Sequence, residues 1–167
     1  MTTHRPINVL FLCTHNSARS ILAEGLLNHI GAGRFLAYSA GSSPRENQQP
    51  HPMALRVLQE AGIATNQLRS KSWDEFGQPS AQPMDLVITV CDNAANEVCP
   101  YWPGGPASAH WGFSDPSEST GSAEKIHAAF RATLLAIRHR IELLTGLPET
   151  NLAGSELQAS VRRLEQA

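Results

Sequence analysis

Charged residues are scarce in this chain, since Asp, Glu, Lys and Arg together make up 17% of its 167 residues, against about 25% in an average globular protein. The 13 Lys and Arg residues nearly balance the 15 Asp and Glu residues, which gives a formal net charge of −2. This balance excludes a polybasic protein that binds nucleic acid or a membrane surface through bulk charge. An apolar content of 41% also excludes a disordered, highly charged chain.

Long apolar runs are missing as well. No segment approaches the ~20 residues that a transmembrane helix needs, and the first 20 residues contain only a short apolar run with no small-residue cleavage site after it. We therefore predict no signal peptide. Three cysteines are an odd number, which does not suit a static disulfide framework. These features predict a cytoplasmic protein with reduced thiols that are buried, metal-bound or chemically active.

Short apolar runs alternate with segments of helical periodicity, which is typical of an α/β protein. Right-handed crossovers between parallel strands then favour a four-stranded parallel sheet of order 2-1-3-4, flanked by helices on both faces. The expected strands are 7–12, 35–40, 84–90 and 109–113. The expected helices are 20–30, 52–61, 126–144 and 157–164, with Ser155 as the expected cap of the last one. Ligands of such sheets bind at the carboxyl ends of the strands next to the switch point, where Cys13 and Cys91 are expected.

The segment from Cys13 to Ser20 reads CTHNSARS and joins the first strand to the first helix. Successive backbone N–H groups at a helix start form a nest for a tetrahedral oxyanion. Arg19 is suited to grip two oxygens of that anion, and the same positive field is expected to depress the pKa of Cys13 and make it a nucleophilic thiolate. The expected oxyanion-binding residues are Thr14, His15, Asn16, Ser17, Ala18, Arg19 and Ser20. The alternative is a buried strand-end cysteine with a surface arginine.

The segment VLFLCTHNSARSILAEG resembles the phosphate-binding loop of low-molecular-weight protein tyrosine phosphatases and of the arsenate reductases that share their fold. Further similar segments are YSAG at 38–41, LRSKSWDEF at 68–76, VITVCDNAANEVCP at 87–100 and AHWGFSDPS at 109–117. The resemblance implies the same four-stranded fold. It leads us to expect one phosphatase-like catalytic domain over residues 1–150, with 151–167 as a C-terminal helical extension of that domain.

Asp115, followed by Pro116, resembles the general acid that this family carries on an Asp-Pro loop. A thiolate that displaces an oxygen from phosphate or arsenate needs a proton donor for the departing oxygen. An ordinary Asp-Pro turn is the alternative. Phosphatases of this fold place aromatic residues directly after the proline, whereas SEST occupies 117–120 here. That segment offers an aromatic substrate little stacking surface, which favours a small inorganic anion.

Cys91 and Cys99 are separated by seven residues, and a phosphatase needs neither of them. Reductases of this family carry two further cysteines in the corresponding segment, so the resemblance implies a relay. Cys13 attacks arsenate, Cys91 then attacks Cys13 and releases arsenite, and Cys99 moves the disulfide to Cys91–Cys99. The alternatives are buried or free thiols, or a zinc site with His110, for which the cysteine spacing is poor.

The spacing between Cys91 and Cys99 is longer by one residue than in well-described thioredoxin-linked members of the family, which leaves the choice of reductant open. Some members bind potassium through an asparagine, a glutamate, a serine and an aspartate. Asn16, Glu24 and Ser39 match, but the aspartate position falls on Ser72, so no potassium requirement is predicted.

The leading hypothesis is a monomeric arsenate reductase with no bound cofactor or metal and with thioredoxin or a glutaredoxin/glutathione system as external thiol reductant. Arsenate is its expected substrate, with phosphate or sulfate as analogues, and neither nucleic acid nor a membrane is an expected partner. The alternatives are a phosphatase acting on phosphotyrosine or small phosphoesters, and a non-catalytic anion or arsenic sensor.

Overall fold

The computed structural model describes residues 5–91, 105–152 and 154–166. Four parallel strands form one sheet in the order β2-β1-β3-β4, which confirms the predicted fold. The strands are β1 (Ile7–Cys13), β2 (Phe35–Gly41), β3 (Leu86–Thr89) and β4 (Ala107–His110). The α-helices are α1 (Arg19–Ile30), α2 (Pro52–Glu60), α4 (Ala123–Thr145) and α5 (Gly154–Arg163).

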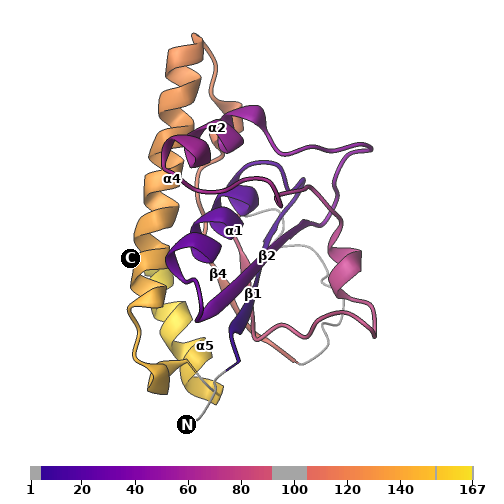
Figure 1. Cartoon of the computed structure of the whole chain (residues 1–167), viewed down its shortest axis with the longest axis vertical. Helices are drawn as coiled ribbons and strands as arrows, with labels where there is room; N and C mark the ends of the chain where they lie inside the picture. Colours follow the sequence, from indigo (N-terminus) through magenta and orange to yellow (C-terminus); the bar gives the residue numbers. More distant parts are fainter. Residues whose placement is uncertain (1–4, 92–104, 153, 167) are drawn as a thin grey trace.

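The two faces of the sheet are covered differently (Figure 1). Val9 and Phe11 of β1 share the larger apolar core with residues from α1, α2, α4 and α5. Leu10 and Leu12 point to the opposite face, where they pack with Trp73 and Phe76 of the short 3₁₀ helix η1 (Trp73–Phe76). Successive residues of a strand face opposite sides, so an uninterrupted apolar run such as VLFL gives β1 two buried faces and places it at the centre of the sheet.

The strand register fixes where the site lies. Cys13 at the end of β1 is level with Gly41 at the end of β2, and Leu12 is level with Thr89 of β3. Because all four strands are parallel, the segments that follow Cys13, Gly41 and Thr89 emerge at one edge of the sheet. The predicted meeting of the Cys13 and Cys91 segments at this edge is confirmed.

Some predicted boundaries are wrong. The fourth strand is Ala107–His110 rather than 109–113, because its partner β3 ends at Thr89, opposite His110. Beyond that point the Trp111 and Phe113 N–H groups still donate to the Thr89 and Val90 carbonyls, at 2.8 and 3.4 Å. The last helix begins at Gly154, so Ser155 lies inside it and does not cap it. The long helix begins earlier than predicted, at Ala123, where the Ser122 hydroxyl accepts a hydrogen bond from the Lys125 N–H.

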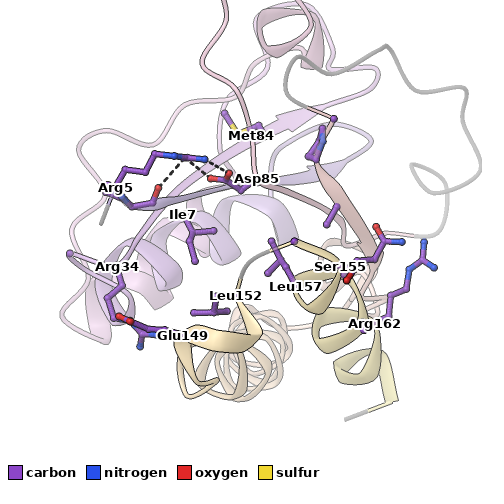
Figure 2. A pocket seen from close by; sticks show the side chains of 18 residues that line it. Arg5, Ile7, Arg34, Met84, Asp85, Glu149, Leu152, Ser155, Leu157 and Arg162 are labelled. Carbon is purple, nitrogen blue, oxygen red and sulfur yellow. Dashed lines mark hydrogen bonds and ion pairs between the residues drawn. The ribbon is translucent and has the colours of Figure 1, made fainter. Parts of the chain in front are cut away.

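A cavity lies at the other end of the sheet (Figure 2). It has a volume of about 1130 Å³ and is lined by residues at the amino ends of the strands, among them Ile7, Asp85 and Ala107. Arg5 closes part of it through a paired interaction with the Asp85 carboxylate at 2.6 and 2.9 Å. None of the predicted site residues lines this cavity. Within the described ranges, no helix has the length and apolar character needed to cross a membrane.

Candidate active site

The loop between β1 and α1 is shaped by Asn16. Its backbone has φ 57°, a left-handed conformation that asparagine adopts more readily than most residues. Its side-chain carbonyl accepts a hydrogen bond from the Lys71 backbone N–H at 2.9 Å, and its main-chain carbonyl accepts one from the Ser70 hydroxyl at 2.6 Å. Asn16 is completely buried, so the loop is tied from beneath to residues far along the chain.

Gly41 allows this loop to lie against the end of β2. A Cβ atom at this position would lie 2.6 Å from the Thr14 carbonyl oxygen and 2.9 Å from the His15 carbonyl carbon. The next two residues bond the loop directly, since the Ser42 N–H donates to the Cys13 carbonyl at 3.0 Å and the Ser43 N–H donates to that of Thr14 at 2.8 Å. Only glycine permits so close an approach of the two backbones.

Cys13 and Cys91 are both buried, neither forms a disulfide, and their side chains are in hydrogen-bond contact. The Thr14 hydroxyl lies 3.5 Å from the Cys91 sulfur. The expected depression of the Cys13 pKa is wrong. The hydrogen bond with Cys91 and burial raise the pKa of Cys13, and this outweighs the lowering by the Arg19 charge and the Thr14 backbone. These contacts favour the thiol over the thiolate at Cys13.

Arg19 reaches across the edge of the sheet toward the segment after β4. Its Nη1 donates to the Phe113 carbonyl at 2.8 Å, and its Nη2 lies 3.4 Å from an Asp115 carboxylate oxygen. Its Nε is buried and has no hydrogen-bond partner among the described residues. Burying a polar N–H without a partner costs roughly 1–3 kcal/mol. The unpartnered Nε–H of Arg19 is suited to donate a hydrogen bond to an incoming oxyanion.

Asp115 lies at the start of a short 3₁₀ helix, η2 (Pro116–Glu118). One of its carboxylate oxygens accepts hydrogen bonds from the Ser117 backbone N–H at 2.9 Å and from the Ser117 hydroxyl at 2.7 Å. The other oxygen faces Arg19. The Asp115 carboxylate therefore faces Arg19, at the end of the loop that begins at Cys13, from the side of β4. Ser117 and Glu118 are exposed and provide no aromatic wall.

The remaining loop residues occupy distinct positions. Thr14, His15 and Ser17 are half-buried, whereas Ala18 and Ser20 are buried. The Ser20 hydroxyl oxygen accepts a hydrogen bond from the Asn16 amide at 2.8 Å. Cys99, the third predicted cysteine of the relay, lies outside the described residues.

Two residues near the loop were missed as contributors to the site. The backbone N–H of His51 donates to the Ser17 carbonyl at 2.8 Å, and the His51 ring packs on Phe130, with the ring centroids 4.5 Å apart. Burial lowers the pKa of His51, and Asp115 opposes that shift. Lys71 was not singled out, yet its ammonium group is buried 3.8 Å from the Glu24 carboxylate.

The zinc alternative gains no support from the described part of the chain. The His110 ring nitrogen Nδ1 lies 2.7 Å from the Thr89 hydroxyl, and the backbone N–H of His110 donates to Glu165 at 2.8 Å. Over residues 5–91, 105–152 and 154–166, no group of three or more His, Cys, Asp or Glu side chains is placed to hold a metal ion.

The parallel 2-1-3-4 sheet, with the loop from Cys13 to Arg19 between its first strand and first helix, fits the class of the low-molecular-weight phosphatases. The family model for low molecular weight phosphotyrosine protein phosphatases matches residues 8–159, and this chain belongs to that family. An arsenate reductase of Halalkalibacterium halodurans is 37% identical over 134 residues, covering 80% of this chain and 91% of that protein.

Solved structures agree with this assignment. A structure described as an arsenate reductase in the oxidized state is 27% identical, with a TM-score of 0.65 over 83% of this chain and 95% of the other. A thioredoxin-dependent arsenate reductase from Corynebacterium glutamicum is 26% identical, with a TM-score of 0.55 over 86% of this chain and 65% of the other.

Proposed function

We infer that this protein is an arsenate reductase, an enzyme that converts arsenate to arsenite at the expense of two thiols. The observation that carries this inference is the contact between the Cys13 and Cys91 thiols beside Arg19, whose buried Nε has no hydrogen-bond partner among the described residues. Reduction of As(V) to As(III) takes two electrons, and a pair of thiols supplies two electrons when it becomes a disulfide. Relatives with the name arsenate reductase over most of the chain support the same conclusion.

In the first step, the oxyanion-binding loop and Arg19 hold arsenate, and the Cys13 sulfur attacks arsenic. One oxygen of arsenate leaves as water, with Asp115 as the proton donor. The product is a covalent bond between the Cys13 sulfur and As(V). Because the pKa of Cys13 is raised, its thiol proton must leave before the attack, and the bound oxyanion is a base that the reaction itself supplies.

In the second step, the Cys91 thiolate attacks the Cys13 sulfur. A disulfide forms, and the electron pair of the sulfur–arsenic bond passes to arsenic, which departs as arsenite. Cys99 then attacks Cys91, so that Cys13 is regenerated and the oxidised pair becomes Cys91–Cys99. An external dithiol restores both thiols. The net balance is arsenate plus two thiols to arsenite, one disulfide and water.

We propose thioredoxin, or alternatively a glutaredoxin/glutathione system, as the external reductant, which the thioredoxin-dependent relative from Corynebacterium glutamicum supports. Such reductants maintain thiols in the cytoplasm, where we place the enzyme. It is proposed to act as a monomer without a bound cofactor or metal, and with no nucleic acid or membrane partner.

We propose one catalytic domain over residues 1–150 with residues 151–167 as part of the same fold. Leu157 and Val161 of α5 belong to the main apolar core, and the Trp111 indole N–H donates to the Val161 carbonyl at 3.3 Å. A phosphatase with an aromatic substrate is less well supported, because the exposed Ser117 and Glu118 follow Pro116 where a phosphotyrosine ring needs a stacking partner.

Single-turnover reduction of arsenate tests the proposed order of steps. Cys99→Ser is expected to release about one equivalent of arsenite and then to stop as a Cys13–Cys91 disulfide, because the electrons come from those two thiols. Cys91→Ser is expected to release little arsenite. Both variants are expected to keep a slow hydrolysis of an aryl phosphate, which needs only Cys13, Arg19 and Asp115.

Peptide mass spectrometry of the stalled proteins maps the disulfide, and Cys13→Ser, which lacks the nucleophile, is the negative control for both reactions. The relay is wrong if Cys91→Ser and Cys99→Ser both turn over arsenate at the parental rate with the same reductant. Wild-type activity of Cys13→Ser would remove the nucleophile itself from the scheme.

A further inference from the structure

The backbone hydrogen bonds of the segment between β4 and Asp115 weaken toward Asp115. The Trp111 N–H donates to the Thr89 carbonyl at 2.8 Å, but the Phe113 N–H lies 3.4 Å from the Val90 carbonyl. That separation exceeds the usual range of about 2.7–3.2 Å for such a bond. The backbone alone therefore holds this segment weakly where it approaches Asp115, and its position depends on its side chains.

Two groups of this segment face Arg19. The Phe113 carbonyl accepts a hydrogen bond from Arg19 Nη1 at 2.8 Å, and an Asp115 carboxylate oxygen lies 3.4 Å from Arg19 Nη2. Phe113 and Asp115 are only two residues apart, so a shift of the Phe113 backbone also moves the Asp115 carboxylate. A proton donor acts only within hydrogen-bond reach of the departing oxygen. The placement of Asp115 therefore depends on what holds Phe113.

The Arg140 side chain of α4 lies over the two aromatic rings of this segment. Its Cζ atom is 4.9 Å from the centre of the Phe113 ring and 5.7 Å from that of the Trp111 ring. A guanidinium within about 6 Å of a ring centroid is attracted to the ring face, more strongly where water is excluded. Trp111 is completely buried, and Phe113 and Arg140 are half-buried, so part of this contact is shielded from water.

The C-terminal residue Glu165 interacts with both sides of this contact. Its carboxylate accepts a hydrogen bond from the His110 backbone N–H at 2.8 Å, directly before Trp111. Burial lowers the pKa of Arg140, and the Glu165 charge opposes that shift. Glu165 thus favours the cationic form of Arg140 and bonds the start of the segment that the cation covers.

We propose that Arg140 is a positioning residue, a cation whose contact with the Phe113 and Trp111 rings holds the Asp115 carboxyl where it protonates the departing oxygen. The proposal rests on the proposed function only in that it takes Asp115 as the proton donor of the site. Arg140 acts through the aromatic segment, and no contact of Arg140 with the reacting atoms is involved.

The test compares two aryl phosphates that differ in their need for a proton. The phenolate that leaves phenyl phosphate is strongly basic and needs a proton donor, whereas a dinitrophenolate departs readily without one. Arg140→Met keeps a long apolar side chain and removes the charge. It is expected to lower kcat/KM for phenyl phosphate about tenfold, equivalent to about 1.4 kcal/mol. For dinitrophenyl phosphate, the expected loss is less than about threefold.

Three further variants make the comparison specific. Arg140→Lys retains a cation and is expected to recover kcat/KM for phenyl phosphate to within about threefold of the parent. Arg138→Met is the matched control, because Arg138 lies on the same helix but pairs with the exposed Glu142 at 3.7 Å. It is expected to hydrolyse both esters at the parental rate. Adding Arg140→Met to Asp115→Asn is expected to cause little further loss, because the proton donor is already absent.

Hydrogen exchange followed by mass spectrometry provides a measurement that needs no activity. Peptides that cover residues 111–119 report on the Phe113 N–H and on the Ser117 N–H, which bonds the Asp115 carboxylate. Exchange in these peptides is expected to be about fivefold faster in Arg140→Met than in the parent. Arg138→Met is expected to exchange at the parental rate.

The outcomes separate clearly. An equal loss of kcat/KM for the two esters, parental values for both, or unchanged exchange in 111–119 of Arg140→Met overturns the proposal. If Arg140→Met does not fold, Phe113→Leu removes the ring instead: a selective loss with phenyl phosphate supports the proposal, and a parental ratio of the two esters overturns it. If the parent hydrolyses neither ester, hydrogen exchange decides. A parent that reduces no arsenate, while Arg140→Met shows the selective loss, refutes the proposed function alone.

Discussion

Replacing Cys91 with alanine is expected to lower the pKa of the Cys13 thiol. The hydrogen bond between the two thiols is the largest influence that raises this pKa, followed by burial, while the Arg19 charge and the Thr14 backbone oppose it. Alanine removes the hydrogen bond and leaves the two opposing influences in place. The variant should therefore have the more acidic and more reactive Cys13, although it lacks the second electron donor.

The size of this effect follows from the strength of the contact. A hydrogen bond between neutral side chains contributes about 0.5–1.5 kcal/mol net, and 1.36 kcal/mol corresponds to one pKa unit. The pKa of Cys13 should therefore fall. Below that pKa, loss of a contact of this strength increases the thiolate fraction by about twofold to tenfold.

Alkylation by iodoacetamide measures this change, because the thiolate is the reacting form. Rates are followed across pH, and peptide mass spectrometry assigns the label to Cys13. Arg19→Met is the opposing control: loss of the guanidinium charge should raise the Cys13 pKa and slow its alkylation. Unchanged or slower alkylation of Cys13 in Cys91→Ala would refute the reasoning.

Three further predictions follow from the same contacts. Gly41→Ala should weaken sulfate binding by more than tenfold in calorimetry, because its Cβ would meet the Thr14 carbonyl oxygen at 2.6 Å; parental affinity would show that the loop tolerates the shift. Deletion of residues 153–167 should lower the midpoint of urea unfolding, because it uncovers Trp111 and removes α5 from the core; an unchanged midpoint would show that α5 is not part of the cooperative unit. Because the folded-state pKa of Cys13 is raised, the folded state holds that proton more tightly than the unfolded state. Its stabilising contribution is therefore complete below the unfolded pKa of about 8.5 and declines above it, by at most about 1.4 kcal/mol per pH unit. Urea titrations at increasing pH should show this extra decline in the parent relative to Cys13→Ser, and parallel curves would contradict it.

The strands and their order could be predicted because their signals are local or topological. Apolar runs such as VLFL predict buried strands, and right-handed crossovers then leave few arrangements of a parallel sheet. The boundaries of β4 could not be predicted in the same way. Where a strand ends depends on the length of its partner, and β3 ends opposite His110, which no local pattern at residues 109–113 indicates.

For the candidate site, too, some features could be predicted from the sequence and others could not. The sequence alone determined the loop from Cys13 to Ser20, its place between a strand and a helix, and the arrival of Cys91 at the same edge of the sheet, because these follow from segment order and strand direction. Only the tertiary structure decided that Cys13 and Cys91 touch and that their contact and burial hold Cys13 as a thiol. It alone brought Lys71 beneath the loop, against Glu24. Charges and hydrogen-bond partners act over a few ångströms in space, and residues as far apart in the chain as 24 and 71 come within that range only once the sheet and its crossovers have formed.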